Sequence, residues 1–257
     1  MIPDPILFSW GVFTIRWYGV LMVSGMAIAV LLSCLEAKRQ GLSGDHYFNM
    51  CLMVLIFGII GARAYYVLFN WDYYGENLIK VFAINEGGLA IHGGLIVGSL
   101  VFVLMGMYYR IGGWRSIDIA APYTALAQAI GRWGNYFNQE AYGYAVDKGK
   151  IPWAMFIDGA YRHPTFLYES IWDLLVFLFL LWLRRRKTVM TGDVFCVYAI
   201  VYSAGRIVIE AFRTDSLMLG SFRIAQVVSA AAILLFSLAI VLRHKGKDQG
   251  GKIISVR

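Results

Sequence analysis

Charged residues are scarce in this chain of 257 residues, because Asp, Glu, Lys and Arg together make up only 15% of it. A soluble domain carries roughly a quarter charged residues, so the shortage argues against an ordinary soluble fold. Apolar residues take their place: 59% of the chain is hydrophobic and the mean hydropathy is +0.62. Aromatic residues reach 16%, which suits the interfacial belts of Trp and Tyr in a membrane protein. The composition therefore predicts an integral membrane protein.

Cysteine is also scarce, and its three examples are Cys34, Cys51 and Cys196. All three lie in apolar runs, and an odd number at such spacing is not a disulfide framework. The sequence has no CxxC pair and no Cys/His cluster, so we expect neither a metal site nor another cofactor. The apolar setting also argues against a cysteine nucleophile. The N-terminus lacks a basic region and an Ala-x-Ala site, so no cleaved signal peptide is predicted.

Seven stretches are apolar and long enough to cross a bilayer, which takes ~20 mostly apolar residues. The predicted fold is therefore all-α, a polytopic membrane bundle of seven transmembrane helices that forms a single integral-membrane domain over residues 1–257. The fourth and sixth stretches are the least apolar, because they contain Arg132 and Arg206. The predicted spans are about 17–35, 47–69, 89–109, 117–137, 166–183, 192–212 and 222–242.

The basic residues set the predicted orientation. The formal net charge is +7, but Lys and Arg cluster in short loops, so membrane topology explains them better than a nucleic-acid partner does. The segments on one side of the membrane carry 13 Lys and Arg residues, and those on the other side carry seven. Because the more basic side faces the cytoplasm, the N-terminus is predicted outside and the C-terminus inside. The loops at about 70–88 and 138–165 then form a small region outside the membrane.

Charged residues within a span are costly, so each is a functional candidate by default. With the predicted orientation, six spans place polar groups in the outer half of the bilayer. One or two such groups would be ordinary structural ion pairs, but the shared depth of the whole set favours a functional cavity. The residues at this level are Tyr18, Arg63, His92, Arg132, Asn135, His163, Glu169, Arg206, Glu210 and Arg213.

The fourth span meets the outer loop in the run GRWGNYFNQE, residues 131–140. Arg132 offers a planar fork of donors that suits a phosphate. Asn135 and Asn138 add amide donors on nearly the same face of the helix. The alternative interpretation is a helix end with interfacial polar residues, but Arg132 has no acidic partner nearby in the sequence.

The sixth span carries a polar stripe, because Tyr202, Arg206, Glu210 and Arg213 fall at positions i, i+4, i+8 and i+11. Arg206 and Glu210 have the spacing of an ion pair. This stripe has two readings, a self-neutralised surface that faces other helices and part of a functional site.

His92 opens the third span and is followed by two glycines, so a bulky group can approach it. It could serve as a base or donate a hydrogen bond to a phosphate, although a lone His in an apolar helix is more often structural. Gly94 and Gly98 form a small-xxx-small pair that predicts helix packing. The block that begins at His163 predicts a loop entering a helix, with a structural role for Glu169.

Together these motifs resemble those of the prolipoprotein diacylglyceryl transferase family, over nearly the whole chain. The block around Arg132 is the most specific part of the resemblance. Some positions differ from the expected family pattern: Phe166 stands where Gln is usual, Gln139 stands where Gly is expected, and Ala62 and Ala64 flank Arg63. The matching segments are 15–19, 61–63, 92–94, 131–143, 163–169 and 206–213.

The resemblance implies a transferase that moves the diacylglyceryl group of phosphatidylglycerol to the lipobox cysteine thiol in the signal peptide of a prolipoprotein. This is the first step of bacterial lipoprotein maturation. A thioether forms, glycerol-1-phosphate leaves, and the enzyme needs neither a cysteine of its own nor a cofactor. The family further implies a multi-pass protein of the bacterial cytoplasmic (inner) membrane, in contact with membrane lipids, whose site faces the outer leaflet.

For this reaction we expect Arg132 and Arg206 to bind the phosphate and its developing charge. His92 is the third catalytic candidate, as acceptor of the thiol proton or as a phosphate ligand. The other candidates for phosphatidylglycerol binding are Asn135, Tyr18, Tyr202 and Gly143. The predicted supporting residues are Arg63, Asn138, Glu140, Glu210 and Arg213.

Other classes of membrane protein fit the sequence less well. A transporter should show paired broken spans or a two-fold repeat, and neither is evident. A retinal receptor needs a Lys in its last span, whereas all lysines here lie in loops or tails. An intramembrane aspartyl protease needs two span aspartates, and only Asp173 qualifies. The GLSG string at 41–44 matches a rhomboid protease motif, but it lies in a predicted cytoplasmic loop.

Overall fold

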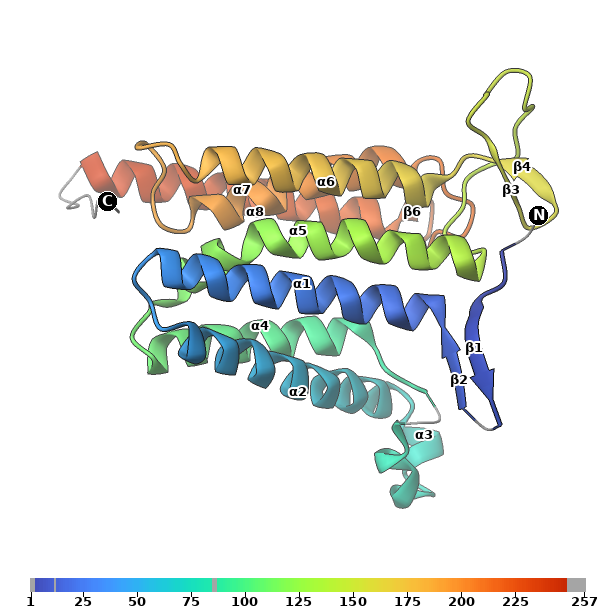
Figure 1. Cartoon of the computed structure of the whole chain (residues 1–257), viewed down its shortest axis with the longest axis horizontal. Coiled ribbons are helices and arrows are strands. Elements are labelled where there is room, and N and C mark those ends of the chain that lie inside the picture. The colour runs from blue at the N-terminus through green and yellow to red at the C-terminus, as the bar shows by residue number, and fades with distance from the viewer. Residues whose placement is uncertain (1–2, 12, 85–86, 249–257) are drawn as a thin grey trace. The chain divides into compact units, whose positions relative to one another are not determined.

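A computed structural model describes residues 3–11, 13–84 and 87–248, and helices dominate it (Figure 1). Every predicted span coincides with one long helix, which confirms the helical fold class. The long helices are α1 (Trp17–Arg39), α2 (Gly44–Phe69), α4 (Ile91–Tyr108), α5 (Gly113–Asn138), α6 (Thr165–Leu183), α7 (Asp193–Glu210) and α8 (Ile224–Asp248).

Short elements connect the long helices. The turn of helix α3 (Trp71–Tyr74) and the 3-10 helix η1 (Leu78–Phe82) lie between α2 and α4. Three antiparallel hairpins are formed by β1 with β2, β3 with β4, and β5 with β6. Their bounds are Ile6–Trp10 and Phe13–Arg16, Met155–Ile157 and Ala160–Arg162, and Met218–Leu219 and Phe222–Arg223.

Five of the long helices, α1, α2, α4, α6 and α8, are long and apolar enough to cross a membrane. The other two are α5 and α7, the helices of the fourth and sixth predicted spans. In its 18 residues α7 carries Asp193, Arg206 and Glu210, and α5 carries Arg132. The multi-pass character of the protein is thus confirmed, whereas the count of seven spans stays a prediction.

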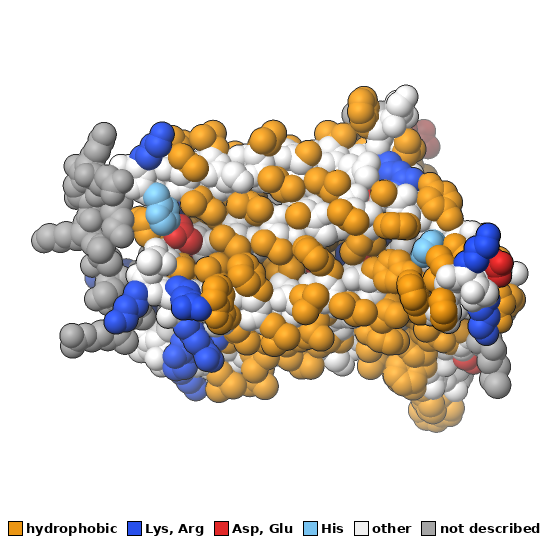
Figure 2. All heavy atoms as spheres, turned by 90° about the horizontal axis from the view of Figure 1, so that it is seen from above, with side chains coloured by type: hydrophobic (Ala, Val, Ile, Leu, Met, Phe, Trp, Pro, Cys, Tyr) orange, Lys and Arg blue, Asp and Glu red, His pale blue; other side chains and the backbone are white. Residues whose placement is uncertain are grey.

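The apolar helices expose most of their side chains, which a soluble protein would bury. Only 6% of the apolar stretch of α8 is buried, and Leu234 is 73% exposed. Figure 2 shows hydrophobic side chains over the middle of one face, with Lys and Arg side chains gathered toward its two ends. A surface of this kind is stable against lipid tails, and its charged ends suit the two bilayer surfaces.

The described contacts divide the chain into two compact units, residues 1–32 with 120–257 and residues 33–119. In the second unit α2 packs against α4 through glycine. A Cβ on Gly93 would collide with the Gly61 carbonyl, and Gly94 and Gly98 approach Gly58 and Val54 of α2. The small residues therefore act in helix packing, as predicted. The single domain over residues 1–257 stays a prediction.

In the first unit, α7 packs against both α6 and α8. Its buried core draws on α5, α6 and α7, with Ala125, Leu180 and Val194 among its members. The N-terminal part of α1 lies close to α5, because a Cβ on Gly134 would stand 2.7 Å from the Tyr18 ring. This packing brings the polar ends of α5, α6 and α7 together.

Candidate functional site

Short hydrogen bonds fix the three helices that carry the polar residues of the first unit. The Ser170 hydroxyl of α6 donates to the Ala129 carbonyl of α5 at 2.8 Å, and the indole N–H of Trp172 donates to the Val201 carbonyl of α7 at 3.0 Å. Gly205 of α7 lies directly against the Trp172 indole, where a Cβ would collide with it. These contacts hold α6 in a fixed register between its two neighbours.

Glu169, in the first turns of α6, lies at the centre of the site. Its Oε2 is 2.6 Å from Nε of Arg132, and its Oε1 pairs with Nη1 of Arg206. Nη1 of Arg213 lies 3.7 Å from the same Oε1. One carboxylate therefore joins three arginines from α5, α7 and the segment after α7. We call these arginines, with Glu169 and Glu210, the arginine cluster.

Glu210 is the second carboxylate of the arginine cluster. Its Oε2 is 2.7 Å from Nη2 of Arg206, which confirms the pairing that the i, i+4 spacing predicts. The same oxygen is 3.9 Å from Nε of Arg213. Both carboxylates are buried, and each would be costly to bury without these partners. The arginine cluster thus contains three positive groups and two negative ones.

Arg132 keeps part of its guanidinium accessible. Its Nε faces Glu169, and one Nη is 3.4 Å from the hydroxyl of Tyr202, which is longer than a well-formed hydrogen bond. The other Nη has no hydrogen bond within the described residues, and the side chain is 22% exposed. The outer edge of this guanidinium can therefore receive an anion while Nε remains paired.

A group of amides surrounds Glu140, just beyond the end of α5. Asn135 and Asn138 donate to Oε1 of Glu140 at 3.0 Å and 3.3 Å. The described side-chain contacts of Glu140 thus go to amides and not to arginines. Tyr18 lies half-buried against Gly134, and Trp17 stacks on Phe137 at 4.9 Å between ring centroids.

Gly143 is enclosed by the chain itself. A Cβ there would stand 2.6 Å from Cβ of His163 and 2.9 Å from the Phe212 carbonyl. Its N–H donates to the His163 carbonyl at 2.9 Å, and it forms a β-bridge with Arg213. A glycine is needed here because three backbone segments meet, and this contact helps to fix Arg213 beside Glu169.

Asp215 holds the outward edge of Arg213 through two hydrogen bonds of 2.9 Å, from Nε and from Nη2. Burial by itself would raise the pKa of Asp215, but the hydrogen bonds and the charge of Arg213 outweigh it and lower that pKa. Asp215 is therefore a carboxylate at neutral pH and shares Arg213 with the two glutamates.

His92 and Arg63 belong to the second unit. His92 is exposed at the start of α4, with its ring 6.1 Å from that of Tyr65. Arg63 is buried and donates to the backbone carbonyls of five residues in the segment 80–88. The N–H groups of Arg63 are occupied by these carbonyls, so Arg63 holds that segment in place.

Arg132 has no acidic partner nearby in the sequence, and in the structure its partner is Glu169, 37 residues further along the chain. A structural role alone was expected for Glu169, although it joins all three arginines. The signal for it was the charge balance, since three arginines at one depth need carboxylates. Gln139 has a φ of 53°, in the left-handed region, where the Gly expected from the resemblance would fit without strain. Phe166 is buried against Trp133 and Tyr136.

Known proteins resemble this chain over nearly its full length. A family model described as prolipoprotein diacylglyceryl transferase matches residues 5–242. The phosphatidylglycerol–prolipoprotein diacylglyceryl transferase of Streptococcus equi subsp. zooepidemicus (strain H70) is 45% identical over 250 residues, which cover 95% of this chain and 96% of the relative. The protein of the same name from Streptococcus pyogenes serotype M1 is 44% identical over the same shares.

Proposed function

Because the chain belongs to the prolipoprotein diacylglyceryl transferase family, we propose that its arginine cluster binds the phosphate of phosphatidylglycerol. The activity of the chain is that of the family, the transfer of a diacylglyceryl group from phosphatidylglycerol to a prolipoprotein. The acceptor is the thiol of the lipobox cysteine in the signal peptide. The observation that carries this proposal is the accessible edge of Arg132, which lies beside two further arginines. A guanidinium group can donate two parallel hydrogen bonds to the oxygens of one phosphate.

In this reaction the prolipoprotein supplies the nucleophile, and the enzyme has to stabilise the leaving group. The thiolate of the prolipoprotein attacks the glycerol carbon, a carbon–sulfur bond forms, and the carbon–oxygen bond to the phosphate breaks. Glycerol-1-phosphate leaves with the bonding electron pair. Arg132 and Arg206 bind the phosphate and stabilise the charge that develops on it. Because Glu169, Glu210 and Asp215 together balance the charge of the three arginines, anion binding here rests on the accessible N–H groups of Arg132 and not on a surplus of positive charge.

The residues around the arginines orient the lipid. Tyr202, next to Arg132, and Tyr18, against the end of α5, contact the head group together with Asn135. Asn138 and Glu140 hold Asn135, while Glu210 holds Arg206 and Arg213. Gly143 acts through the backbone contact that fixes Arg213. In the second unit, Arg63 orders the segment that precedes His92, and this is the supporting role proposed for it.

His92 accepts the proton of the attacking thiol or donates to the phosphate, and kinetics distinguish the two roles. If His92 is the base, His92→Gln lowers kcat and removes the acid limb of the pH–rate profile. If it is only a phosphate ligand, the same change raises KM and leaves the profile in place.

The protein crosses the bacterial inner membrane seven times, with its N-terminus outside and the site open to the outer leaflet. The distribution of Lys and Arg supports this orientation. The two helices of low hydropathy fit it as well, because the charges of Arg132, Arg206 and Glu210 meet partners inside the protein. Cysteine accessibility mapping of the loops tests the count and the orientation.

The experiment uses the full-length purified protein with phosphatidylglycerol and a lipobox peptide, and mass spectrometry follows the gain of one diacylglyceryl unit. Arg132→Ala and Arg206→Ala should abolish the gain, with a loss of 10²-fold or more, because each removes a donor to the leaving group (about 10²–10³ per donor). Near-normal lipidation by either variant would overturn the assignment.

Matched variants separate function from folding. Arg132→Lys keeps the positive charge opposite Glu169 but loses the planar fork, so it should fold and still lose most of kcat. Arg16→Gln removes an exposed arginine from β2 and should retain full activity. Replacing Cys34, Cys51 and Cys196 together should preserve thioether formation, and loss of activity in a correctly folded triple variant would contradict the substrate thiol as nucleophile.

A further inference from the structure

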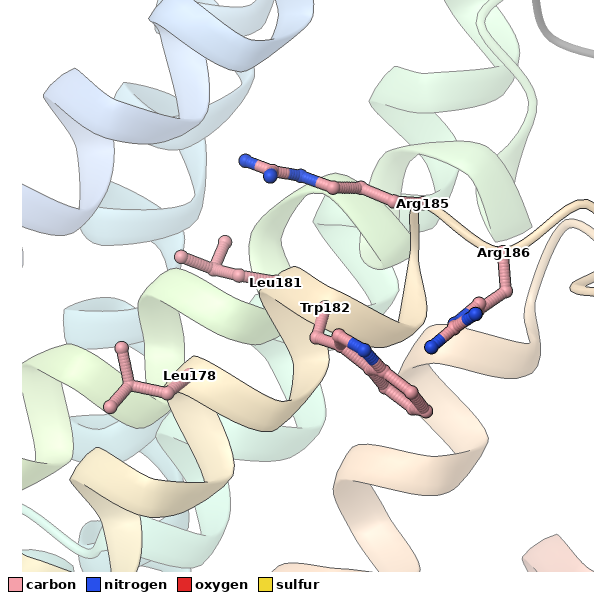
Figure 3. Close-up of a pocket in the computed structure, with 5 residues that line it drawn as sticks. All are labelled: Leu178, Leu181, Trp182, Arg185 and Arg186. Carbon is pink, nitrogen blue, oxygen red and sulfur yellow. The ribbon is translucent and has the colours of Figure 1, made fainter.

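The far end of α6 from the arginine cluster carries a second feature, an open hollow of about 420 Å³. Figure 3 shows its lining: Arg185 reaches out over Leu181, and Arg186 folds back toward Trp182. Leu178, Leu181 and Trp182 fall at i, i+3 and i+4, the spacing of one face of α6, and Arg185 and Arg186 follow directly after the helix ends. The hollow is therefore a strip that is apolar along α6 and basic where the helix ends.

Two positive charges in this strip have no carboxylate partner in the part of the chain that the structure describes. Arg185 and Arg186 are both exposed, and neither forms an ion pair within the described residues. The guanidinium carbon of Arg186 lies 4.0 Å from the centre of the Trp182 ring, a cation–π contact that leaves its N–H groups available. This differs from the arginine cluster, where carboxylates already occupy the guanidinium groups.

The remaining lining suits hydrocarbon. Leu178 and Trp182 are each about half exposed, at 52% and 51%, and they lie seven residues before Arg185 and four residues before Arg186. Tryptophan is typical of the membrane–water interface, where its ring meets both the head groups and the acyl chains. The order along the strip, from Leu through Trp to Arg, follows the order of a phospholipid from acyl chain to head group.

We propose that this hollow binds one anionic phospholipid, with its phosphate on Arg185 and Arg186 and an acyl chain along Leu178 and Leu181. Charge complementarity selects an anionic over a zwitterionic lipid, and the apolar strip selects a lipid over a soluble anion. A volume of this size lies within the ~300–1,000 Å³ of pockets that hold small molecules. If the N-terminus lies outside, as proposed above, this lipid belongs to the cytoplasmic leaflet. The rest of the argument does not depend on that orientation.

The test measures lipid occupancy at Trp182 directly. The full-length protein is placed in phosphatidylcholine bilayers that contain increasing fractions of phosphatidylserine with brominated acyl chains, which quench nearby tryptophan. The difference between the native protein and Trp182→Phe isolates the signal of this one residue among eight tryptophans. Arg185→Gln/Arg186→Gln should weaken the preference for the anionic lipid about 10-fold or more, since it removes the charge-assisted hydrogen bonds to the phosphate.

The matched control is Lys187→Gln/Lys245→Gln, which removes the same charge from the same predicted side but not from the hollow. Because these lysines do not line the hollow and solvent screens their charge, this variant should keep the preference at Trp182 within about twofold of the native value. An equal loss in both variants, or no loss in the arginine variant, would overturn the proposal. Displacement of the lipid by millimolar glycerol phosphate would also overturn it, by identifying a site for soluble phosphates. Phosphatidylserine is not the donor lipid, so none of these outcomes depends on transferase activity.

Discussion

Arg132 and Arg63 are both held inside helical parts of the molecule, but their partners differ. Arg132 faces the carboxylate of Glu169 and keeps one edge accessible, and Glu169 itself serves two further arginines. Arg63 is 5% exposed and donates to the backbone carbonyls of Lys80, Val81 and Gly87, among others. The first arrangement keeps a positive site available to an anion, whereas the second uses the guanidinium to order a loop.

The comparison teaches that the partner decides what an arginine within a membrane protein can do. Neutral carbonyls satisfy the N–H groups of Arg63, and they all belong to one segment of chain. Carboxylates compensate most of the charge in the arginine cluster and join three helices. Removing the carboxylate of Glu169 should therefore destabilise the whole first unit. Removing the contacts of Arg63 should destabilise a single loop.

The largest effect is expected for Glu169→Gln. This change leaves three guanidinium groups around a neutral side chain at a buried position, and breaking such a buried ion pair costs about 3–5 kcal/mol. The melting temperature in detergent, followed by tryptophan fluorescence, should fall sharply. Glu140→Gln is the control, because Glu140 is exposed and bonds only to amides in its described contacts. Equal melting temperatures for the two variants would show that the carboxylate of Glu169 does not stabilise the arginine cluster.

An intermediate and local effect is expected for Arg63→Met. The carbonyls of the segment 80–88 lose their donor, and an unsatisfied buried group costs about 1–3 kcal/mol, less where water reaches it. Limited proteolysis should cleave near Lys80 faster, while the global melting temperature changes less than in Glu169→Gln. Unchanged proteolysis together with a large fall in global stability would mean that Arg63 is not a loop-ordering residue. Arg16→Met supplies the control for loss of a surface arginine.

The smallest effect concerns pH and Asp215→Asn. The pKa of Asp215 is lower in the folded protein, so the pair with Arg213 stabilises the fold above the unfolded pKa of about 3.9. That contribution disappears as the pH falls through the lowered pKa. Since Asp215 is 44% exposed, solvent screening limits the contribution to below about 1 kcal/mol. Melting curves between pH 7 and pH 3 should show a smaller acid-induced loss in Asp215→Asn, and a larger loss would reverse the predicted sign.

Periodic features of the molecule could be predicted from the sequence. The seven long helices follow from apolar length, and the Arg206–Glu210 pair follows from i, i+4 spacing. Contacts between distant segments could not be predicted in this way. Glu169 is 37 residues from both Arg132 and Arg206, and the carbonyls that bind Arg63 have no signature in the side-chain sequence. Such contacts depend on how α5, α6 and α7 pack.

The bridging position of Glu169 has a thermodynamic consequence for the arrival of a lipid. Long arginine side chains lose considerable rotamer entropy when they are immobilised. Here an internal anion already holds them, so that loss occurs during folding and not at the encounter with phosphatidylglycerol. The incoming phosphate meets donors that are already aligned, which is how a preorganised site lowers its activation barrier.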